Sequence, residues 1–246
     1  VITQVTLMVK PMPETSALVA CDAADFDTAE KLLAELVNTE TLPAAVELLA
    51  GEAWRDDPAL ATESESAAAR LVVGFEGTSA EVDWMVDRLP VEWKRVADVS
   101  ATEIREDAAL RAWGRLTESP AGRSNGDAPL VVEINVLPSA TVSVVRLLRQ
   151  VAPDCSIQAH AGDGVVRARF AGEPNEMAST LRQCVRPAVS EAGGAMVVLA
   201  NPPGAELSQA DVWGPPAQEA AVLQAIKSGF DPQGILNPDR FVYASR

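Results

Sequence analysis

The chain has 246 residues, of which 48% are hydrophobic and 22% charged, a balance typical of a folded protein with a substantial core. Its formal net charge of −15 argues against nucleic acid as a partner, because phosphate binding needs clustered lysine and arginine. The sequence contains no apolar run of about 18 residues and no signal peptide, so we expect a cytoplasmic protein that does not span a membrane.

Charge and cysteine placement add two further expectations. Residues 14–66 hold thirteen acidic and two basic side chains, which predicts a solvated face with a loop rather than an acidic docking patch. The three cysteines, Cys21, Cys155 and Cys184, have no CxxC spacing, so they predict neither a disulfide framework nor a zinc or iron–sulfur site.

The first half of the chain predicts one βαββαβ unit. Residues 1–13 begin with a β-branched, alternating segment, Val1–Lys10, which predicts a strand. Residues 14–97 then follow the ferredoxin-like order. The strands of this unit are expected at Ser16–Cys21, Ala44–Leu49, Arg70–Glu76 and Val91–Val96, with helices at Phe26–Val37 and from the capping box Thr78–Glu81 to Leu89.

Residues 98–128 predict a connecting helix and a flexible loop, and the same order then recurs over residues 129–200. A second capping box, Ser100–Glu103, is expected to open the connecting helix. Two such units, with antiparallel sheets covered by helices, predict an α+β fold. The elements expected in the second unit are strands at Leu130–Val136, Ser156–His160, Val165–Phe170 and Ala195–Leu199, and helices at Ser139–Val151 and Asn175–Glu191.

Residues 201–246 predict a C-terminal helix followed by a docking tail. Pro215 and Pro216 can open a helix that carries one apolar stripe, and Gly229 offers a stop. The Asp-Pro and Asn-Pro pairs that follow force extended or turn geometry. The side chains of the stripe are Leu223, Ile226 and Phe230.

The order IKSGFDPQGILNPDRF, at residues 226–241, resembles the C-terminal signature of FAD-linked oxidases of the vanillyl-alcohol oxidase type. Residues 1–13 resemble the last strand of that family's FAD-binding domain, which implies that this domain is missing from the chain. Shorter segments resemble the family in the same order, and with the tail they are most similar to the smaller flavin-type subunit of bacterial glycolate oxidase. These segments are Thr41–Leu49, Leu71–Gly77 and Asp211–Gly214.

The resemblance implies FAD in the full-length protein and no cofactor in this chain alone. It also implies that Asn237 and Arg240 contribute to docking on a flavin domain. The expected partners are the protein's own or an adjacent FAD-binding domain, a catalytic flavin subunit and an iron–sulfur subunit, in a complex that oxidises glycolate to glyoxylate.

The single histidine, His160, begins the sequence HAGDGVVR, a tight turn between two strands that resembles the HxGDGNxH motif of 2-hydroxy acid dehydrogenases in this family. Both histidines of that motif contribute to a divalent metal site. Here Arg167 replaces the second one, and a guanidinium repels a metal, so we expect no metal site. Ala192 likewise stands where catalytic members have a base histidine. His160 is therefore a weak catalytic candidate, and a turn histidine bonded to the backbone is the favoured interpretation.

Three functions remain open from the sequence. The leading hypothesis is the cap domain of an FAD-dependent 2-hydroxy acid oxidoreductase subunit, non-catalytic as isolated here. The first alternative is a catalytically competent D-lactate or 2-hydroxy acid dehydrogenase that uses His160 with an acid the sequence does not identify. The second alternative is a non-enzymatic ferredoxin-like interaction module.

Overall fold

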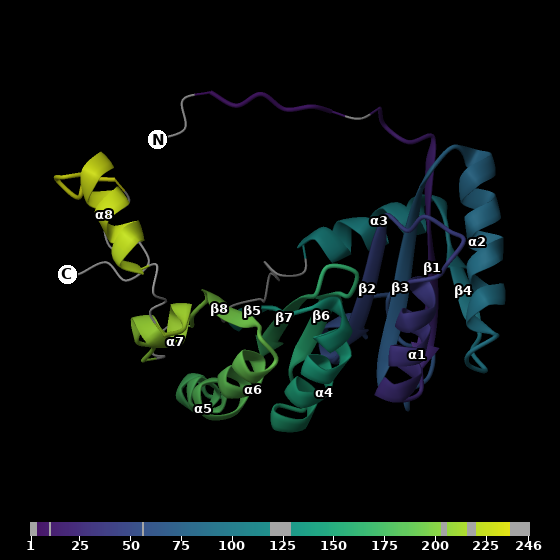
Figure 1. The fold of residues 1–246 in the computed structure, drawn as a ribbon. Coiled ribbons are helices and arrows are strands. Elements are labelled where there is room, and N and C mark those ends of the chain that lie inside the picture. Colours follow the sequence, from purple (N-terminus) through teal and green to yellow (C-terminus); the bar gives the residue numbers. More distant parts are fainter. Residues whose placement is uncertain are drawn as a thin grey trace. The chain divides into compact units, whose positions relative to one another are not determined.

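The computed structural model describes residues 4–9, 11–55, 57–118, 129–202, 206–215 and 220–236. The fold is α+β with antiparallel sheets, which confirms the predicted class (Figure 1). The chain divides into two compact units, the first made of Val1–Val46 and Asp57–Arg115, the second of Glu47–Asp56 and Leu116–Arg246.

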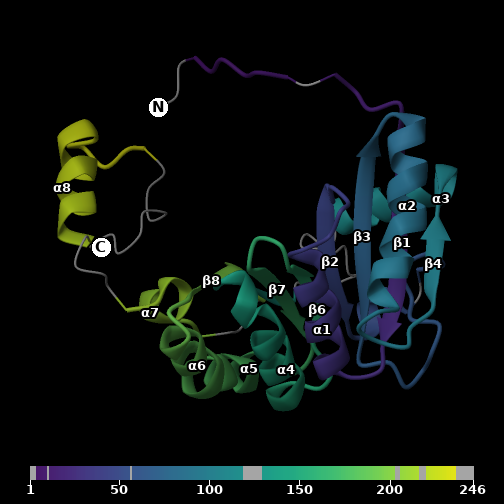
Figure 2. The same cartoon turned by 45° about the vertical axis from the view of Figure 1, so that its right-hand side comes forward.

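The first unit has the ferredoxin-like strand order β4-β1-β3-β2. β1 pairs antiparallel with both β3 and β4, and β2 starts beside β3, where Ala44 N donates to Gly74 O at 2.7 Å. The helices α1 and α2 contact each other and these strands (Figure 2). The elements are β1 (Thr15–Ala23), α1 (Phe26–Leu36), β2 (Ala45–Ala50), β3 (Ala69–Gly77), α2 (Ser79–Trp93) and β4 (Ala101–Ile104).

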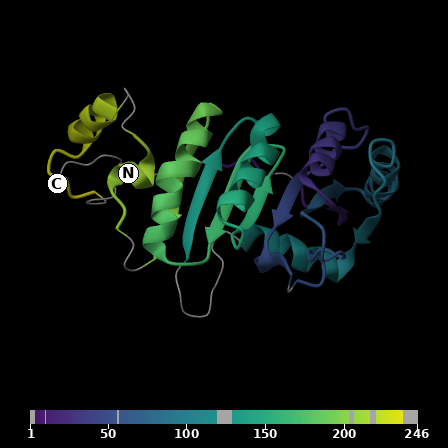
Figure 3. The same ribbon diagram turned by 90° about the horizontal axis from the view of Figure 1, so that it is seen from below.

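The second unit repeats this order as β6-β7-β5-β8, with the Glu47–Ala50 part of β2 paired to β6. Its helices gather on one side of the strands (Figure 3). The elements are η1 (Glu52–Trp54), β5 (Leu130–Asn135), η3 (Pro138–Ala140), α4 (Thr141–Val151), β6 (Ser156–His160), β7 (Val165–Phe170), α5 (Pro174–Thr180), η4 (Leu181–Val185), α6 (Arg186–Glu191) and β8 (Ala195–Ala200).

The helix predicted at Asn175–Glu191 is interrupted by the π-helical turn η4. Pro187 lies two residues after that turn and has no backbone N–H to donate. A wider turn before the proline moves the preceding carbonyls away from its ring. The segment keeps its predicted inward face, because Leu181, Val185 and Val189 are buried.

Alternation along β7 separates two faces of the second unit's sheet. Val166, Ala168 and Phe170 are buried, whereas Arg167 and Arg169 are partly exposed. The buried side chains face α4, which contacts both β6 and β7 through an apolar face. The arginines therefore lie on the face opposite the helices.

Helix α3 (Glu106–Glu118) packs on the first unit through a close approach to β3. An ideal Cβ at Gly74 would lie 2.4 Å from Trp113 Cζ2, so only glycine lets this indole ring reach the strand. Ala109 and Ala112 are buried along the same helix. A side chain at Gly74 would push the helix away from the sheet.

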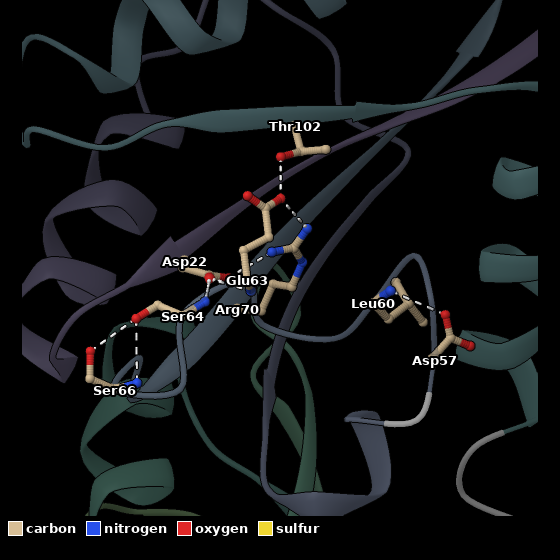
Figure 4. Close-up of polar contacts among 8 residues, drawn as sticks. All are labelled: Asp22, Asp57, Leu60, Glu63, Ser64, Ser66, Arg70 and Thr102. Atoms are coloured by element: carbon tan, nitrogen blue, oxygen red, sulfur yellow. Dashed lines mark hydrogen bonds and ion pairs between the residues drawn. The ribbon is translucent and has the colours of Figure 1, made fainter.

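A buried arginine ties the acidic loop after β2 to the first unit (Figure 4). Arg70 Nη1 donates to Asp22 Oδ1 at 2.7 Å, and Arg70 Nη2 to Glu63 Oε1 at 3.3 Å. Asp22 Oδ2 accepts from the backbone N–H groups of Glu63 and Ser64 at 2.7 and 2.9 Å. Thr102 of β4 also donates to Glu63, so strands β1, β3 and β4 all hold this loop.

The strand predicted at Val91–Val96 is wrong. Residues 91–93 complete α2, because Leu89, Glu92 and Trp93 share its buried face. Glu92 is held there by Thr39 Oγ1, which donates to Oε2 at 2.6 Å, and by Arg88 Nε, which donates to Oε1 at 3.1 Å. These hydrogen bonds to Glu92 stabilise the last turn of α2, so residues 91–93 remain helical and do not form a strand.

The second capping box was also misassigned, because Ala101–Ile104 form β4. β1 has an edge whose backbone groups need partners, and residues 101–104 supply them opposite Leu18–Cys21. Ile104 faces the core while Glu103 is exposed, as a strand requires. The first unit therefore extends past the boundary predicted at residue 97, and α3 begins at Glu106.

The strand predicted at Val1–Lys10 is not formed by residues 4–9, which are exposed and have no strand partner in the described part of the chain. A strand needs a neighbour for its backbone N–H and C=O groups. Whether residues 1–13 complete a sheet of another domain remains a prediction.

The segment before the C-terminal helix is fixed to the second unit by two arginines. Arg182 Nε and Nη2 donate to the carboxylate of Asp211 at 2.7 and 3.0 Å, and Arg186 donates to the Asp211 carbonyl at 2.5 Å. Gly214 has φ +89, and an ideal Cβ there would lie 2.8 Å from Arg186 Nη1. These contacts position α7 (Gln209–Trp213).

The predicted C-terminal helix is confirmed as α8 (Ala220–Phe230). It runs one residue past the stop predicted at Gly229, and the positive φ of this region lies at Gly234 instead. Among the described residues, no helix has both the length and the apolar character needed to cross a bilayer.

Replacing Arg70 by alanine is expected to lower the free energy of unfolding by about 3–5 kcal/mol, because Asp22 would stay largely buried without its cation. Urea unfolding followed by circular dichroism measures this loss. The matched control is Arg105→Ala, whose ion pair with Asp83 is solvent-exposed and should contribute less than about 1 kcal/mol. Equal losses in both variants would contradict the structural role of Arg70.

Candidate functional site

Five polar side chains converge on the sheet face opposite the helices of the second unit. They come from four neighbouring strands, and the register places His160 opposite Glu47 and Arg167 opposite both Glu133 and Gln158. We call this group the His160 cluster. Its members are Glu47 on β2, Glu133 on β5, Gln158 and His160 on β6, and Arg167 on β7.

Glu47 and His160 form a carboxylate–imidazole pair, with His160 Nδ1 2.5 Å from Glu47 Oε1. The Glu47 side chain is only 6% exposed. Its second oxygen accepts from Gln158 Nε2 at 3.1 Å, and the same amide donates to the carbonyl of Leu116 at 2.9 Å. His160 is therefore bonded to a side chain, whereas the favoured sequence interpretation gave it a backbone partner.

Arg167 occupies the other side of the imidazole. Its Nη1 lies 3.0 Å from His160 Nε2, and its Nε donates to Glu133 Oε2 at 2.9 Å. A guanidinium can only donate, so His160 Nε2 must accept in this contact. The neutral ring therefore carries its proton on Nδ1 and donates it to Glu47.

The hydrogen bond to Glu47 raises the pKa of His160 above its ordinary value of 6.5. Partial burial and the charge of Arg167 act in the opposite direction. Protonation removes the acceptor at Nε2, so the charged ring keeps Glu47 but loses the contact with Arg167. The contact with Arg167 therefore belongs to the neutral form of His160.

The turn between β6 and β7 holds His160 at the end of its strand. Asp163 N and Gly164 N donate to the His160 carbonyl at 3.1 and 3.0 Å. Gly164 has φ +75, and an ideal Cβ there would lie 2.0 Å from the carbonyl oxygen of Val136. A glycine is therefore required at this position, as the sequence pattern indicates.

The residues present do not fit a divalent metal ion. Arg167 takes the place of the motif's second histidine, and its guanidinium faces the only lone pair that His160 could offer. In the described ranges, no three histidine, cysteine, aspartate or glutamate side chains are arranged to hold a metal ion. Burial raises the pKa of the Cys21 and Cys155 thiols to about 12 and about 11, which keeps them protonated.

The other predicted site residues have different outcomes. Asn237 and Arg240 lie outside the described residues. Ala192 follows the last residue of α6 and offers no proton acceptor on its side chain. Glu47 was missed as a site residue: it lies in the strand pattern at Thr41–Leu49, but the spacing of the sequence cannot show a partner 113 residues away.

Comparison with known families and curated proteins gives consistent matches. The family described as FAD linked oxidases, C-terminal domain, matches residues 12–197 and 216–241. Glycolate oxidase subunit GlcD from Escherichia coli K12, and from Escherichia coli O6:H1 strain CFT073, are each 25% identical over 268 residues. The alignments cover 98% of this chain and 50% of each relative, so the chain spans about half the length of the curated relatives it matches.

Solved structures share the fold at low identity. A chitooligosaccharide oxidase superposes with a TM-score of 0.55, at 13% identity, over 96% of this chain and 56% of its own. An alkyldihydroxyacetonephosphate synthase superposes with a TM-score of 0.54, at 13% identity, over 93% of this chain and 45% of its own. At this identity the likeness concerns the fold alone.

Replacing Glu47 by glutamine is expected to lower the pKa of His160, because the carboxylate is the main group that raises it. His160 is the only histidine, so its ring protons can be followed through a pH titration by NMR without assignment. The matched control, Glu65→Gln in the exposed loop of the first unit, should leave the titration unchanged. An unchanged midpoint in Glu47→Gln would contradict the pairing.

The raised pKa of His160 also makes the free energy of unfolding depend on pH. Because the folded-state pKa of His160 is raised, its contribution to the free energy of unfolding is fully present below about pH 6.5 and is lost as pH rises through the folded-state pKa. The stability difference between the wild-type chain and Glu47→Gln should therefore shrink across that interval.

Proposed function

Since the chain belongs to the FAD linked oxidases, whose C-terminal domain it matches over most of its length, we propose that it is the cap domain of an FAD-dependent, glycolate oxidase-like subunit that lacks its own catalytic base. The observation that carries the proposal is the contact of Arg167 with His160 Nε2, at 3.0 Å. With that lone pair engaged and alanine at residue 192, neither of the two expected histidine positions offers a free ring nitrogen as proton acceptor for a substrate hydroxyl.

FAD belongs, in this proposal, to a flavin domain that lies outside this chain. Bound there, the flavin supplies the hydride acceptor for oxidation of a 2-hydroxy acid such as glycolate. The residues of this chain shape one side of the pocket and dock partners. The proposed partners are the FAD-binding domain, a catalytic flavin subunit and an iron–sulfur subunit, and the resemblance to glycolate oxidase subunit GlcD supports that setting.

The described part of the C-terminal tail supports a docking role. Its apolar stripe is exposed, with Phe230 85% accessible and Leu223 and Ile226 about half accessible. The turn after α8 is nevertheless ordered, because Asp231 accepts from Ile235 N and Leu236 N at 3.0 Å each. We assign this stripe, together with Asn237 and Arg240, to contact with the FAD-binding domain.

A second candidate function is favoured by one observation, the Glu47–His160 pair. A buried carboxylate that orients an imidazole is a common arrangement for a general base. Glu47 is the acid that a catalytically competent D-lactate or 2-hydroxy acid dehydrogenase would need beside His160. Arg167 would then have to leave Nε2 when substrate binds.

Turnover of the full-length flavoprotein, assembled with its proposed partner subunits, separates the two functions. In a cap domain without its own base, His160→Ala and Glu47→Gln should each change the rate of dye reduction with glycolate or D-lactate by less than about threefold. A general base at His160 predicts a fall of about 10²–10⁴ in both variants. Flavin absorbance, measured first, shows that each variant holds its cofactor.

Residues 1–246 alone should be colourless after purification, because the proposal assigns FAD binding to a flavin domain outside these residues. A flavin absorption spectrum in that protein would contradict the proposal. The coding sequence upstream of residue 1 tests the alternative of a non-enzymatic interaction module. Codons for a Gly-rich FAD-binding segment there would argue against that alternative.

Phe230→Ser is expected to leave the stability of the chain within about 0.5 kcal/mol of wild type, because the ring is exposed. Binding to the separately produced FAD-binding domain should weaken about tenfold or more, as for a buried interface aromatic. Isothermal titration calorimetry measures the affinity. The matched control is Ser228→Ala on the same helix, and equal affinities for both variants would argue against docking through this stripe.

A further inference from the structure

We propose that the guanidinium of Arg167 takes the place of a divalent metal ion at His160, so that an internal cation holds the His160 cluster together and no metal binds there. The proposal concerns this chain's own side chains and does not depend on the proposed function. It rests on three contacts within the His160 cluster.

The first contact, between Glu47 and His160 Nδ1, orients the imidazole in the way that metal-binding histidines are usually oriented. A histidine that binds a metal usually donates its other ring N–H to a carboxylate, which fixes the tautomer and raises the basicity of the ligating nitrogen. Glu47 provides this carboxylate at 2.5 Å from Nδ1, and Gln158 holds Glu47 in turn at 3.1 Å. The lone pair of Nε2 is therefore available to a cation, and the carboxylate raises its basicity.

The second contact shows which cation is there. Arg167 Nη1 lies 3.0 Å from Nε2, the ring nitrogen to which a metal would bind. A guanidinium cannot lose its proton in a protein, so its charge is permanent. A divalent ion approaching Nε2 would meet both this charge and an occupied lone pair.

The third contact keeps Arg167 in place. Its Nε donates to Glu133 Oε2 at 2.9 Å from the neighbouring strand β5, in a partly buried ion pair. Glu133 and Glu47 therefore flank one imidazole and one guanidinium. Removing the guanidinium would leave the Glu133 carboxylate and a free imidazole nitrogen, two groups that zinc accepts as ligands.

This arrangement predicts that a single substitution converts the cluster into a metal site. Arg167→His removes the cation and adds a second imidazole beside His160 and Glu133. All chains carry Cys184→Ser, because an exposed thiol such as that of Cys184 could bind zinc independently of the cluster. With Zn²⁺ in about 100-fold excess over Kd, the Arg167→His chain should gain about 5–10 °C in Tm. The double variant His160→Ala/Arg167→His is the matched control and should gain none of it.

The chain that keeps Arg167 is expected to show the opposite result, with no metal-dependent gain in Tm at His160. Zn²⁺ and Mn²⁺ should shift its Tm no more than they shift that of His160→Ala. A His160-dependent rise in Tm there would overturn the proposal, as would the absence of any gain in folded Arg167→His.

A second measurement covers the case in which Arg167→His does not fold. In the ¹⁵N-labelled chain with Arg167, long-range ¹H–¹⁵N spectra of the only histidine should show neutral His160 protonated on Nδ1. Adding Zn²⁺ should leave its ring resonances unchanged. Protonation on Nε2, or displacement of those resonances by Zn²⁺, would overturn the proposal.

Discussion

The pairing of Glu47–Ala50 with Ile157–His160 is the constraint on which the candidate site depends. These strand segments are more than 100 residues apart in sequence, yet their antiparallel register sets Glu47 opposite His160. A shift of one residue would move each side chain to the other face of the sheet and separate the carboxylate from the imidazole. The tight turn at Gly164 then fixes β7 against β6, which brings Arg167 to the same face.

Much of the fold could be predicted from the sequence because local signals and tertiary packing agree. Alternation along residues 165–170 gives a strand with one apolar face, and the capping box at Thr78 and Glu81 opens α2 with the two expected hydrogen bonds. The predictions failed where a tertiary requirement overrode a local signal. Residues 91–93 have strand-like composition but complete a helix whose buried face needs Trp93, and the capping-box pattern at residues 100–103 is overruled by the unpaired edge of β1.

The site was less predictable than the fold, because its contacts are long-range. His160 and Arg167 were recognisable from the turn that joins them, and the departure of Arg167 from the histidine motif was visible at once. Glu47, Glu133 and Gln158 carry no local pattern that marks them as partners. Their roles follow from strand order, which sequence spacing alone does not give.

The His160 cluster and the apolar stripe of α8 differ in how many of their groups have partners within the described chain. In the His160 cluster, the imidazole, both glutamates and the guanidinium each have a partner inside the second unit. On α8, the apolar side chains are exposed although the turn that follows them is hydrogen-bonded. A polar cluster whose groups already hydrogen-bond one another has little interaction energy left for a ligand, whereas exposed apolar area gains free energy when another surface covers it. The balance of these two terms favours association through the tail over chemistry at His160.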